Sequence, residues 1–192
     1  ITDTLAYLEK LGINAIELMP VNEFEGNISW GYNPSFYFAP DKYYGHKDDL
    51  KQLIDECHKR GIAVIIDMVL NHAYDQCPFV QLYFDGQKPS VQNPWFNVEH
   101  NFTNPDAQWG NDFNHESEYT QKLVDSINSY WMSEYKVDGF RFDFTKGFGN
   151  NIKGMDDPWG SNYDADRIRL LKRMADEIWK RNDKAIVILE HL

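Results

Sequence analysis

Short apolar stretches alternate with amphipathic helical segments along this chain, and no other feature restricts the fold as strongly. Residues 62–66 are all hydrophobic, and a strand without polar residues is typical of a parallel sheet covered on both faces. The segments follow the order helix, strand, helix, strand, irregular segment, helix, strand, helix, strand. Successive units of this kind predict a parallel α/β sheet. Strands are expected at 13–18, 62–66, 137–143 and 185–190, with helices at 2–11, around 50–57, after Ser117 and after Asp164.

Two long segments lack a sustained hydrophobic period. Residues 21–46 are interpreted as a loop. Residues 73–115 are rich in Asn, Pro, Gly and aromatic residues, and we interpret them as an inserted subdomain because the α/β alternation resumes cleanly afterwards. A closed barrel and a doubly wound sheet both fit the pattern. The sequence contains no GxGxxG or P-loop motif, which makes the nucleotide-binding version less favourable.

Charge and composition narrow the range of partners. The 192 residues carry a net charge of −11, which disfavours nucleic acids and anionic membrane surfaces and makes a neutral ligand the better candidate. Aromatic residues make up 15% of the chain, which suits either sugar binding or a large aromatic core, and composition does not separate the two. Cys57 and Cys77 are expected to be free thiols, because two cysteines in these settings do not make a disulfide framework.

The start of the chain says little about location. Ile1 begins directly in helix-like sequence without an initiator Met, so we expect that an upstream part of the natural protein lies outside this chain. No signal peptide opens the sequence, and no apolar run approaches the length of a membrane span. The location therefore stays open between secreted or periplasmic and cytoplasmic.

Charged residues gather where three of the predicted strands end. They are Asp67, then Arg141 with Asp143, then Glu190. In a parallel α/β fold these ends open onto one face, and that face holds the active site in barrels. Arg141 and Asp143 share one side of their strand because strand side chains alternate. Three carboxylates arriving together repel one another, which favours an active site over a purely structural role, with a metal site as the competing use.

The settings of the carboxylates suggest a division of labour. Asp143, beside Arg141, is expected to have a lowered pKa and to suit a nucleophile. Glu190 follows an apolar strand and could act as an acid. Retaining glycoside cleavage needs those two roles, with the carboxyl groups about 5 Å apart. His72, directly after a strand end, fits a buried structural histidine as well as a functional one.

Three motifs resemble the first three signature regions of the α-amylase family, glycoside hydrolase family 13. They are Asp67-x-Val69-x-Asn71-His72, Gly139-Phe140-Arg141-x-Asp143-x-x-Lys146 and the strand-end Glu190. Residues 30–45 are similar to the loop after the second strand in that family, and residues 109–114 resemble a short signature late in its inserted B domain. The resemblance covers nearly the whole chain.

The resemblance implies a (β/α)8 TIM barrel of which this chain carries strands two to five. Residues 1–72 and 116–192 would form the partial catalytic barrel, and residues 73–115 the inserted, irregular B domain. The implied activity is retaining cleavage of α-glucosidic bonds in α-glucans of the starch or glycogen type, as in an α-amylase. The alternatives are an α-glucan transglycosylase, a branching or debranching enzyme, or a non-catalytic relative that binds sugar.

The same resemblance assigns a role to each matching residue. Asp143 matches the catalytic nucleophile and Glu190 the general acid/base, while Arg141 matches the arginine that orients the nucleophile. The implied substrate-binding residues are Tyr32, Asp67, His72, Arg141 and Lys146.

Within that set, Tyr32 would stack on the sugar being cleaved, Asp67 and His72 would surround it, and Lys146 would contact the leaving-group side. Asn71 matches a frequent calcium ligand, so calcium is a candidate ion, although no cofactor is required.

The fourth signature of the family, which supplies a third essential carboxylate after the seventh strand, is absent from the sequence. We therefore expect this piece to lack glucan hydrolysis on its own. Four strands cannot close an eight-stranded barrel, so unpaired edges are expected at the two outer strands. Such edges could pair with a second copy.

Overall fold

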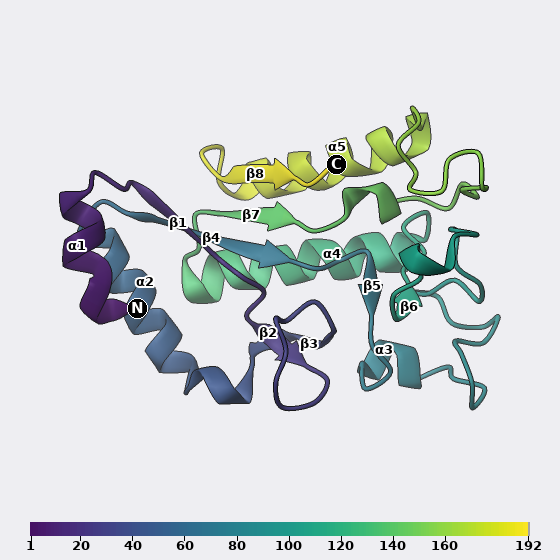
Figure 1. Cartoon of the computed structure of the whole chain (residues 1–192), viewed down its shortest axis with the longest axis horizontal. Helices are drawn as coiled ribbons and strands as arrows, with labels where there is room; N and C mark the ends of the chain where they lie inside the picture. Colours follow the sequence, from purple (N-terminus) through teal and green to yellow (C-terminus); the bar gives the residue numbers. More distant parts are fainter. Residues whose placement is uncertain (192) are drawn as a thin grey trace.

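A four-stranded parallel sheet organises the computed structural model, which describes residues 1–191. Its strands follow one another across the sheet in chain order, and every neighbouring pair is parallel (Figure 1). This order confirms the predicted series of βα units. The strands are β1 (Ala15–Leu18), β4 (Ala63–Met68), β7 (Gly139–Phe142) and β8 (Ile186–Leu189).

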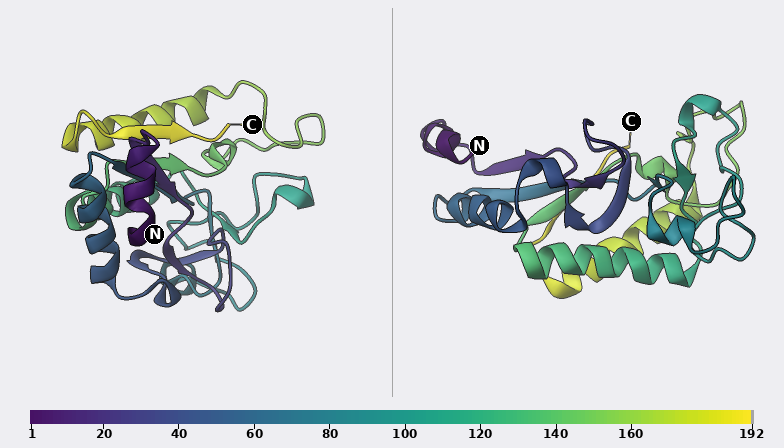
Figure 2. Two further views of the ribbon diagram at one scale, coloured as in Figure 1. Left: turned by 60° about the vertical axis from the view of Figure 1, so that its left-hand side comes forward. Right: turned by 90° about the horizontal axis from the view of Figure 1, so that it is seen from below.

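Helices precede each of these strands, as the sequence predicts. The two longest, α4 and α5, lie side by side on one face of the sheet (Figures 1 and 2). Ser117 and Asp164 cap them, each accepting hydrogen bonds from backbone N–H groups of the first turn, so both predicted helix starts are confirmed. The α-helices are α1 (Leu5–Lys10), α2 (Lys47–His58), α3 (Pro78–Gln81), α4 (Glu118–Tyr130) and α5 (Ala165–Arg181).

Shorter helical turns complete the chain. A π-helical turn, Trp131–Tyr135, extends α4. Four 3-10 turns lie at Thr2–Thr4, Lys42–Tyr44, Pro105–Ala107 and Thr145–Gly147.

The expectation of a plain loop over residues 21–46 is wrong. β2 (Asn22–Phe24) and β3 (Pro34–Pro40) form a small antiparallel sheet there. Burial along β3 does not follow hydrophobicity, because Ser35 and Tyr37 are buried whereas Phe36 and Phe38 are exposed. A strand that buries a hydroxyl and exposes phenyl rings has no recognisable pattern in sequence.

The long irregular segment projects beyond the carboxyl ends of the parallel strands (Figure 1). Its two ends are held together by β5 (His72–Ala73) and β6 (Asn111–Asp112), which pair antiparallel. A parallel bridge joins Phe102 of this segment to Lys153 in the loop after β7. The division into a barrel part (1–72 and 116–192) and a B domain (73–115) stays a prediction.

The core lies between the parallel sheet and the helices behind it. Val64, Ile66, Phe140 and Phe142 are completely buried and pack with apolar side chains of α2, α4 and α5. Cys57 and Cys77 are buried free thiols, as expected.

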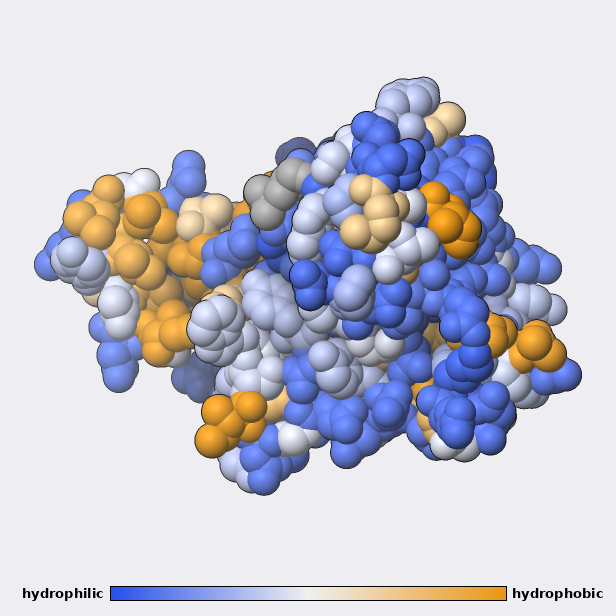
Figure 3. All heavy atoms as spheres, turned by 45° about the vertical axis from the view of Figure 1, so that its right-hand side comes forward, coloured by the Kyte–Doolittle hydropathy of each residue, from blue (hydrophilic) through white to orange (hydrophobic). Residues whose placement is uncertain are grey.

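The sheet is open at both sides. β1 and β8 each pair with a single strand within residues 1–191, which agrees with a partial (β/α)8 barrel. Apolar side chains gather on the surface at the end that holds α1, where Leu11 and Ile13 are exposed (Figure 3). No helix in residues 1–191 is both long and apolar enough to span a bilayer.

Candidate active site

Three neighbouring strands bring their charged residues to one place. Asp67 of β4 lies opposite Arg141 of β7 in the sheet register, and Arg141 lies opposite Ile188 of β8. Asp143 and Glu190 come two residues after Arg141 and Ile188, so the alternation of side chains keeps the four charged groups on the same side. The structure therefore assembles the cluster that the strand ends predict.

The guanidinium of Arg141 contacts all three carboxylates. Its Nη1 lies 2.8 Å from Asp67 Oδ1 and 3.0 Å from Asp143 Oδ1, and its Nη2 lies 3.0 Å from Glu190 Oε1. One positive charge among three carboxylates leaves an excess of negative charge, which favours protonation of at least one of them. The pKa of Arg141 is raised because these carboxylates outweigh the burial that opposes its charge.

The expectation of a lowered pKa at Asp143 is wrong. Burial raises the pKa of Asp143 to about 6, and although Arg141 opposes this rise, the charges of Asp67 and Glu190 add to it. Burial also raises the pKa of Asp67, against the hydrogen bonds that Tyr32 and Arg141 donate to it. Arg141 thus holds the cluster together without making Asp143 a strong acid.

The backbone makes an unusual turn directly after Asp143. Phe144 adopts a left-handed conformation, with φ 40° and ψ 57°, which side chains other than Gly or Asn rarely take. In this conformation its N–H donates a 2.8 Å hydrogen bond to Glu190 Oε2. The residue after one carboxylate therefore holds the other carboxylate in position.

Tyr32 and His72 are joined to the cluster by hydrogen bonds. The Tyr32 hydroxyl donates to Asp67 Oδ2 at 2.7 Å, and burial together with that carboxylate raises the pKa of Tyr32. His72 Nε2 donates to the backbone carbonyl of Tyr32 at 2.8 Å. Burial lowers the pKa of His72 to about 4, so its ring is neutral at pH 7 and its Nδ1 is an acceptor. That buried Nδ1 has no hydrogen-bond partner within residues 1–191.

Lys146 and Asn71 lie next to this cluster on different structural elements. Lys146 is buried and donates from Nζ to Ser161 Oγ at 2.9 Å. Asn71 is buried as well, and its Oδ1 has no hydrogen-bond partner in the described part of the chain. A free amide oxygen fits a calcium ligand, yet Ca²⁺ takes 6–8 oxygen ligands. Residues 1–191 contain no group of three or more His, Cys, Asp and Glu side chains that could hold a metal ion, so no chemistry is assigned to one here.

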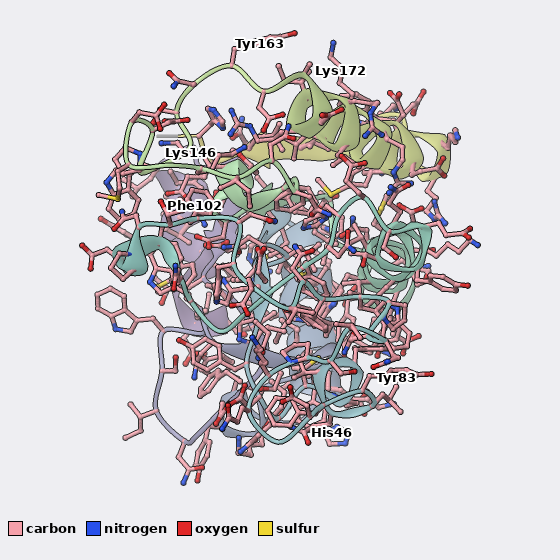
Figure 4. The ribbon with its side chains drawn as sticks, turned by 90° about the vertical axis from the view of Figure 1, so that its right-hand side faces the viewer. His46, Tyr83, Phe102, Lys146, Tyr163 and Lys172 are labelled. Atoms are coloured by element: carbon pink, nitrogen blue, oxygen red, sulfur yellow. The ribbon has the colours of Figure 1, made fainter. Side chains whose placement is uncertain are left out.

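A cavity of about 960 Å³ opens over the cluster at the carboxyl ends of the strands, the end that faces the viewer in Figure 4. Asp143, Glu190, Arg141, His72, Tyr32 and Lys146 all line it, so six of the predicted site residues share one cavity. Asp67 lies beneath it, 2% exposed, and Asn71 is likewise outside the lining. Further residues complete the wall: Ser29, Trp30, Asn33, Tyr74, Trp109, Phe144, Trp159 and Ser161.

Several of these wall residues have no counterpart among the sequence predictions. Trp159 comes from an irregular segment, and Phe144 looks in sequence like an ordinary strand residue, whereas Trp109 opens the 109–114 motif but has no predicted role in the site. For Trp159 the high aromatic content is the one signal in the sequence, because it fits sugar binding as well as a large core.

Comparison with known proteins gives consistent matches. The family model described as the alpha amylase catalytic domain matches residues 1–111. Pullulanase of Bacillus subtilis is 35% identical over 158 residues, which cover 72% of this chain and 21% of pullulanase. The 1,4-alpha-glucan branching enzyme GlgB of Vibrio parahaemolyticus is 31% identical over 198 residues, which cover 96% of this chain and 24% of that enzyme.

A solved structure agrees with the sequence matches. Eubacterium rectale Amy13B superposes with a TM-score of 0.77 at 26% identity, over 98% of this chain and 38% of its own length. The chain thus spans about a fifth to a quarter of the length of the curated relatives described above.

Proposed function

This chain belongs to the α-amylase family, and we propose that the full-length enzyme containing it, called here the parent enzyme, cleaves or transfers α-glucosidic bonds of α-glucans with retention of configuration. One observation carries the proposal: a single arginine, Arg141, contacts both Asp143 and Glu190. A guanidinium that binds two carboxylates keeps them close together, as retaining glycoside cleavage requires.

In the proposed reaction Asp143 and Glu190 act in two steps. Asp143 attacks the anomeric carbon while Glu190 donates its proton to the glycosidic oxygen that leaves, and a covalent glycosyl-enzyme forms. Glu190 then takes a proton from a water molecule or from a sugar hydroxyl. That oxygen attacks the anomeric carbon and releases Asp143. Water gives hydrolysis, and a sugar hydroxyl gives transfer.

Tyr32, Asp67 and His72 are proposed to hold the sugar that is cleaved. The hydrogen bond from Tyr32 to Asp67 fixes the phenol ring at the cavity wall, where its face can cover the apolar side of a pyranose. His72 lines the same cavity with a neutral ring that is held by its hydrogen bond to the Tyr32 carbonyl.

The test uses the purified parent enzyme with starch, glycogen and pullulan. We expect oligosaccharide products or changed branching on at least one of them, and the first product released should carry the α-configuration by NMR. A β-anomer as the first product would contradict the assigned roles. Lack of turnover on all three glucans would favour a non-catalytic sugar-binding protein, although such a protein has no need for Asp143 and Glu190 on one guanidinium.

The isolated chain is proposed to be inactive, because the site described here holds two of the three carboxylates that the family uses. Purified residues 1–192 should release no maltose from soluble starch, measured by reducing-sugar assay beside the parent enzyme. Measurable release would overturn this part of the proposal.

Calcium is proposed as a structural ion near Asn71, on the single basis of its unpartnered buried Oδ1. A bound ion stabilises the folded state in proportion to its concentration relative to Kd. Addition of Ca²⁺ to chelator-treated parent enzyme should raise its Tm, and substitution of Asn71→Leu should remove that rise.

Self-association of the isolated chain through the edges of β1 and β8 is proposed as well. Met19 beside β1 and Leu189 on β8 are exposed, which adds apolar surface to two strands with free edges. Light scattering after size exclusion should show a mass above that of one chain.

A further inference from the structure

Three tryptophans line the cavity with no role assigned above, and two of them, Trp109 and Trp159, form a ring pair. Trp159 is 42% exposed and Trp109 is 37% exposed, and both line the cavity over Asp143 and Glu190. Their ring centroids are 6.4 Å apart and their planes differ by 31°. Large indole faces left open on a cavity wall are typical of ligand sites, because burying them in the core would have been more stable.

The wall is directly connected to the candidate acid. Trp109 packs edge-on against Phe144, with centroids 5.0 Å apart, and the Phe144 N–H donates to Glu190. The ring centroid of Trp109 also lies 6.3 Å from that of His72. Trp109 therefore lies beside the rings of both His72 and Trp159.

A polar pair accompanies the indoles. Lys146 Nζ donates to Ser161 Oγ, two residues after Trp159, and both side chains line the same cavity. An ammonium group has three donors, so Lys146 can also bind sugar hydroxyls. An apolar face beside fixed hydroxyl-binding groups matches the two kinds of surface that a glucose ring presents.

The loop that carries Trp159 and Ser161 is held in place at several points. Lys153 and Asp164 form a buried ion pair across it, and the buried Arg167 donates to the carbonyl of Gly160 at 2.7 Å. The backbone of Lys153 also donates to Asn101 at 2.7 Å, which ties the loop to the irregular segment. Preorganisation of this kind reduces the entropy lost when a ligand binds.

We propose that Trp159, supported by Trp109 and accompanied by the Lys146–Ser161 pair, is the binding platform for the sugar on the leaving-group side of the cleaved bond. In a transfer reaction the same platform holds the acceptor sugar. This inference rests on the proposed function and adds a residue that determines which glucans are used. Trp159 acts by binding, whereas Lys153, Asp164 and Arg167 act as positioning residues for its loop.

The test compares two substrates in the parent enzyme. One is an oligosaccharide, either linear maltohexaose or a branched α-1,6-linked oligosaccharide, whichever the wild-type enzyme cleaves. The other is α-maltosyl fluoride, whose leaving group is too small to reach Trp159. Trp159→Ala should lower kcat/KM for the oligosaccharide by about tenfold and leave the fluoride within about twofold. Trp159→Phe should restore most of the loss.

Tyr163→Ala is the matched control. Tyr163 lies on the same loop and is 83% exposed, but it does not line the cavity. Figure 4 shows it at the outer rim of the molecule, whereas Lys146 lies further inside. Its replacement should leave kcat/KM unchanged for both substrates.

The possible outcomes separate the two proposals. Equal losses on both substrates, no loss on either, or the same loss in Tyr163→Ala would overturn the platform and leave the proposed function standing. If the wild-type enzyme turns over neither substrate, the proposed function fails, and the platform fails with it.

Discussion

Replacement of Asp143 by asparagine should inactivate the parent enzyme and at the same time stabilise it. The substitution keeps the shape of the side chain and removes its charge. As the proposed nucleophile, Asp143 forms the covalent intermediate, so turnover of an α-glucan should fall by about 10⁴-fold or more. The stabilising effect follows from the raised pKa of this buried group.

The size and sign of that effect can be worked out from the site. The pKa of Asp143 is about 6 in the folded state against an ordinary value of 3.8, and its side chain is only 16% exposed. This difference corresponds to about 3 kcal/mol. Because the folded pKa of an acid is raised, the ionised carboxylate destabilises the fold fully above pH 6 and not at all below pH 3.8. Asp143→Asn should therefore add up to about 3 kcal/mol at pH 8 and almost nothing near pH 3.8.

The assay is the Tm of wild-type and Asp143→Asn parent enzyme at pH 4, 6 and 8. The variant should melt several degrees higher at pH 8, and the difference should shrink toward pH 4. Asp164→Asn is a matched control of opposite sign. The Asp164 carboxyl has a lowered pKa, since the Lys153 ion pair and the helix-capping hydrogen bonds outweigh burial, and its loss should lower the Tm at pH 8.

Two results would refute this reasoning. An Asp143→Asn enzyme that keeps substantial turnover cannot have lost its nucleophile. A variant less stable than the wild-type enzyme at pH 8 would mean that the contact with Arg141 outweighs the burial of the charge.

Three further predictions follow from the same geometry. As the pH is lowered, kcat/KM should fall with a midpoint near pH 6. Arg141→Gln should move this midpoint to higher pH, because the guanidinium lowers the pKa of Asp143, and Arg141→Lys should move it less. Asp164→Asn should raise KM for oligosaccharides more than for α-maltosyl fluoride, since the ion pair holds the loop of Trp159. Gly139→Ala should destabilise the fold by about 1–3 kcal/mol in urea unfolding, because the new methyl group would lie 2.2 Å from the Ile186 carbonyl oxygen. Gly149→Ala is the control, because its methyl group would make only ordinary van der Waals contacts.

The strands and the charge cluster could be predicted from the sequence because their signals are local. A wholly apolar run such as residues 62–66 has few alternatives to a buried parallel strand, and the parallel arrangement then brings Asp67, Asp143 and Glu190 to one edge. Ser117 and Asp164 are capping residues whose chemistry acts within one helical turn.

The features that escaped prediction depend on the surroundings. The sequence shows Arg141 beside Asp143, but it does not show how deeply Asp143 is buried or that Arg141 is shared by three carboxylates. The neighbouring positions of Arg141 and Asp143 in the sequence therefore predicted the wrong direction for the pKa shift of Asp143. Trp159 could not be recognised, because contacts between residues far apart in the chain, such as Lys153 with Asn101, place its loop.

The left-handed turn at Phe144 separates two properties of the site that are usually linked. Its hydrogen bond to Glu190 comes from the backbone N–H, so any residue that adopts the left-handed conformation at position 144 can donate it. The side chain itself faces the wall, where it supports Trp109. A residue at position 144 that keeps the left-handed conformation can therefore change the support of Trp109 and still hold Glu190. The group that holds the carboxylate and the group that shapes the cavity wall thus belong to one residue but to different parts of it.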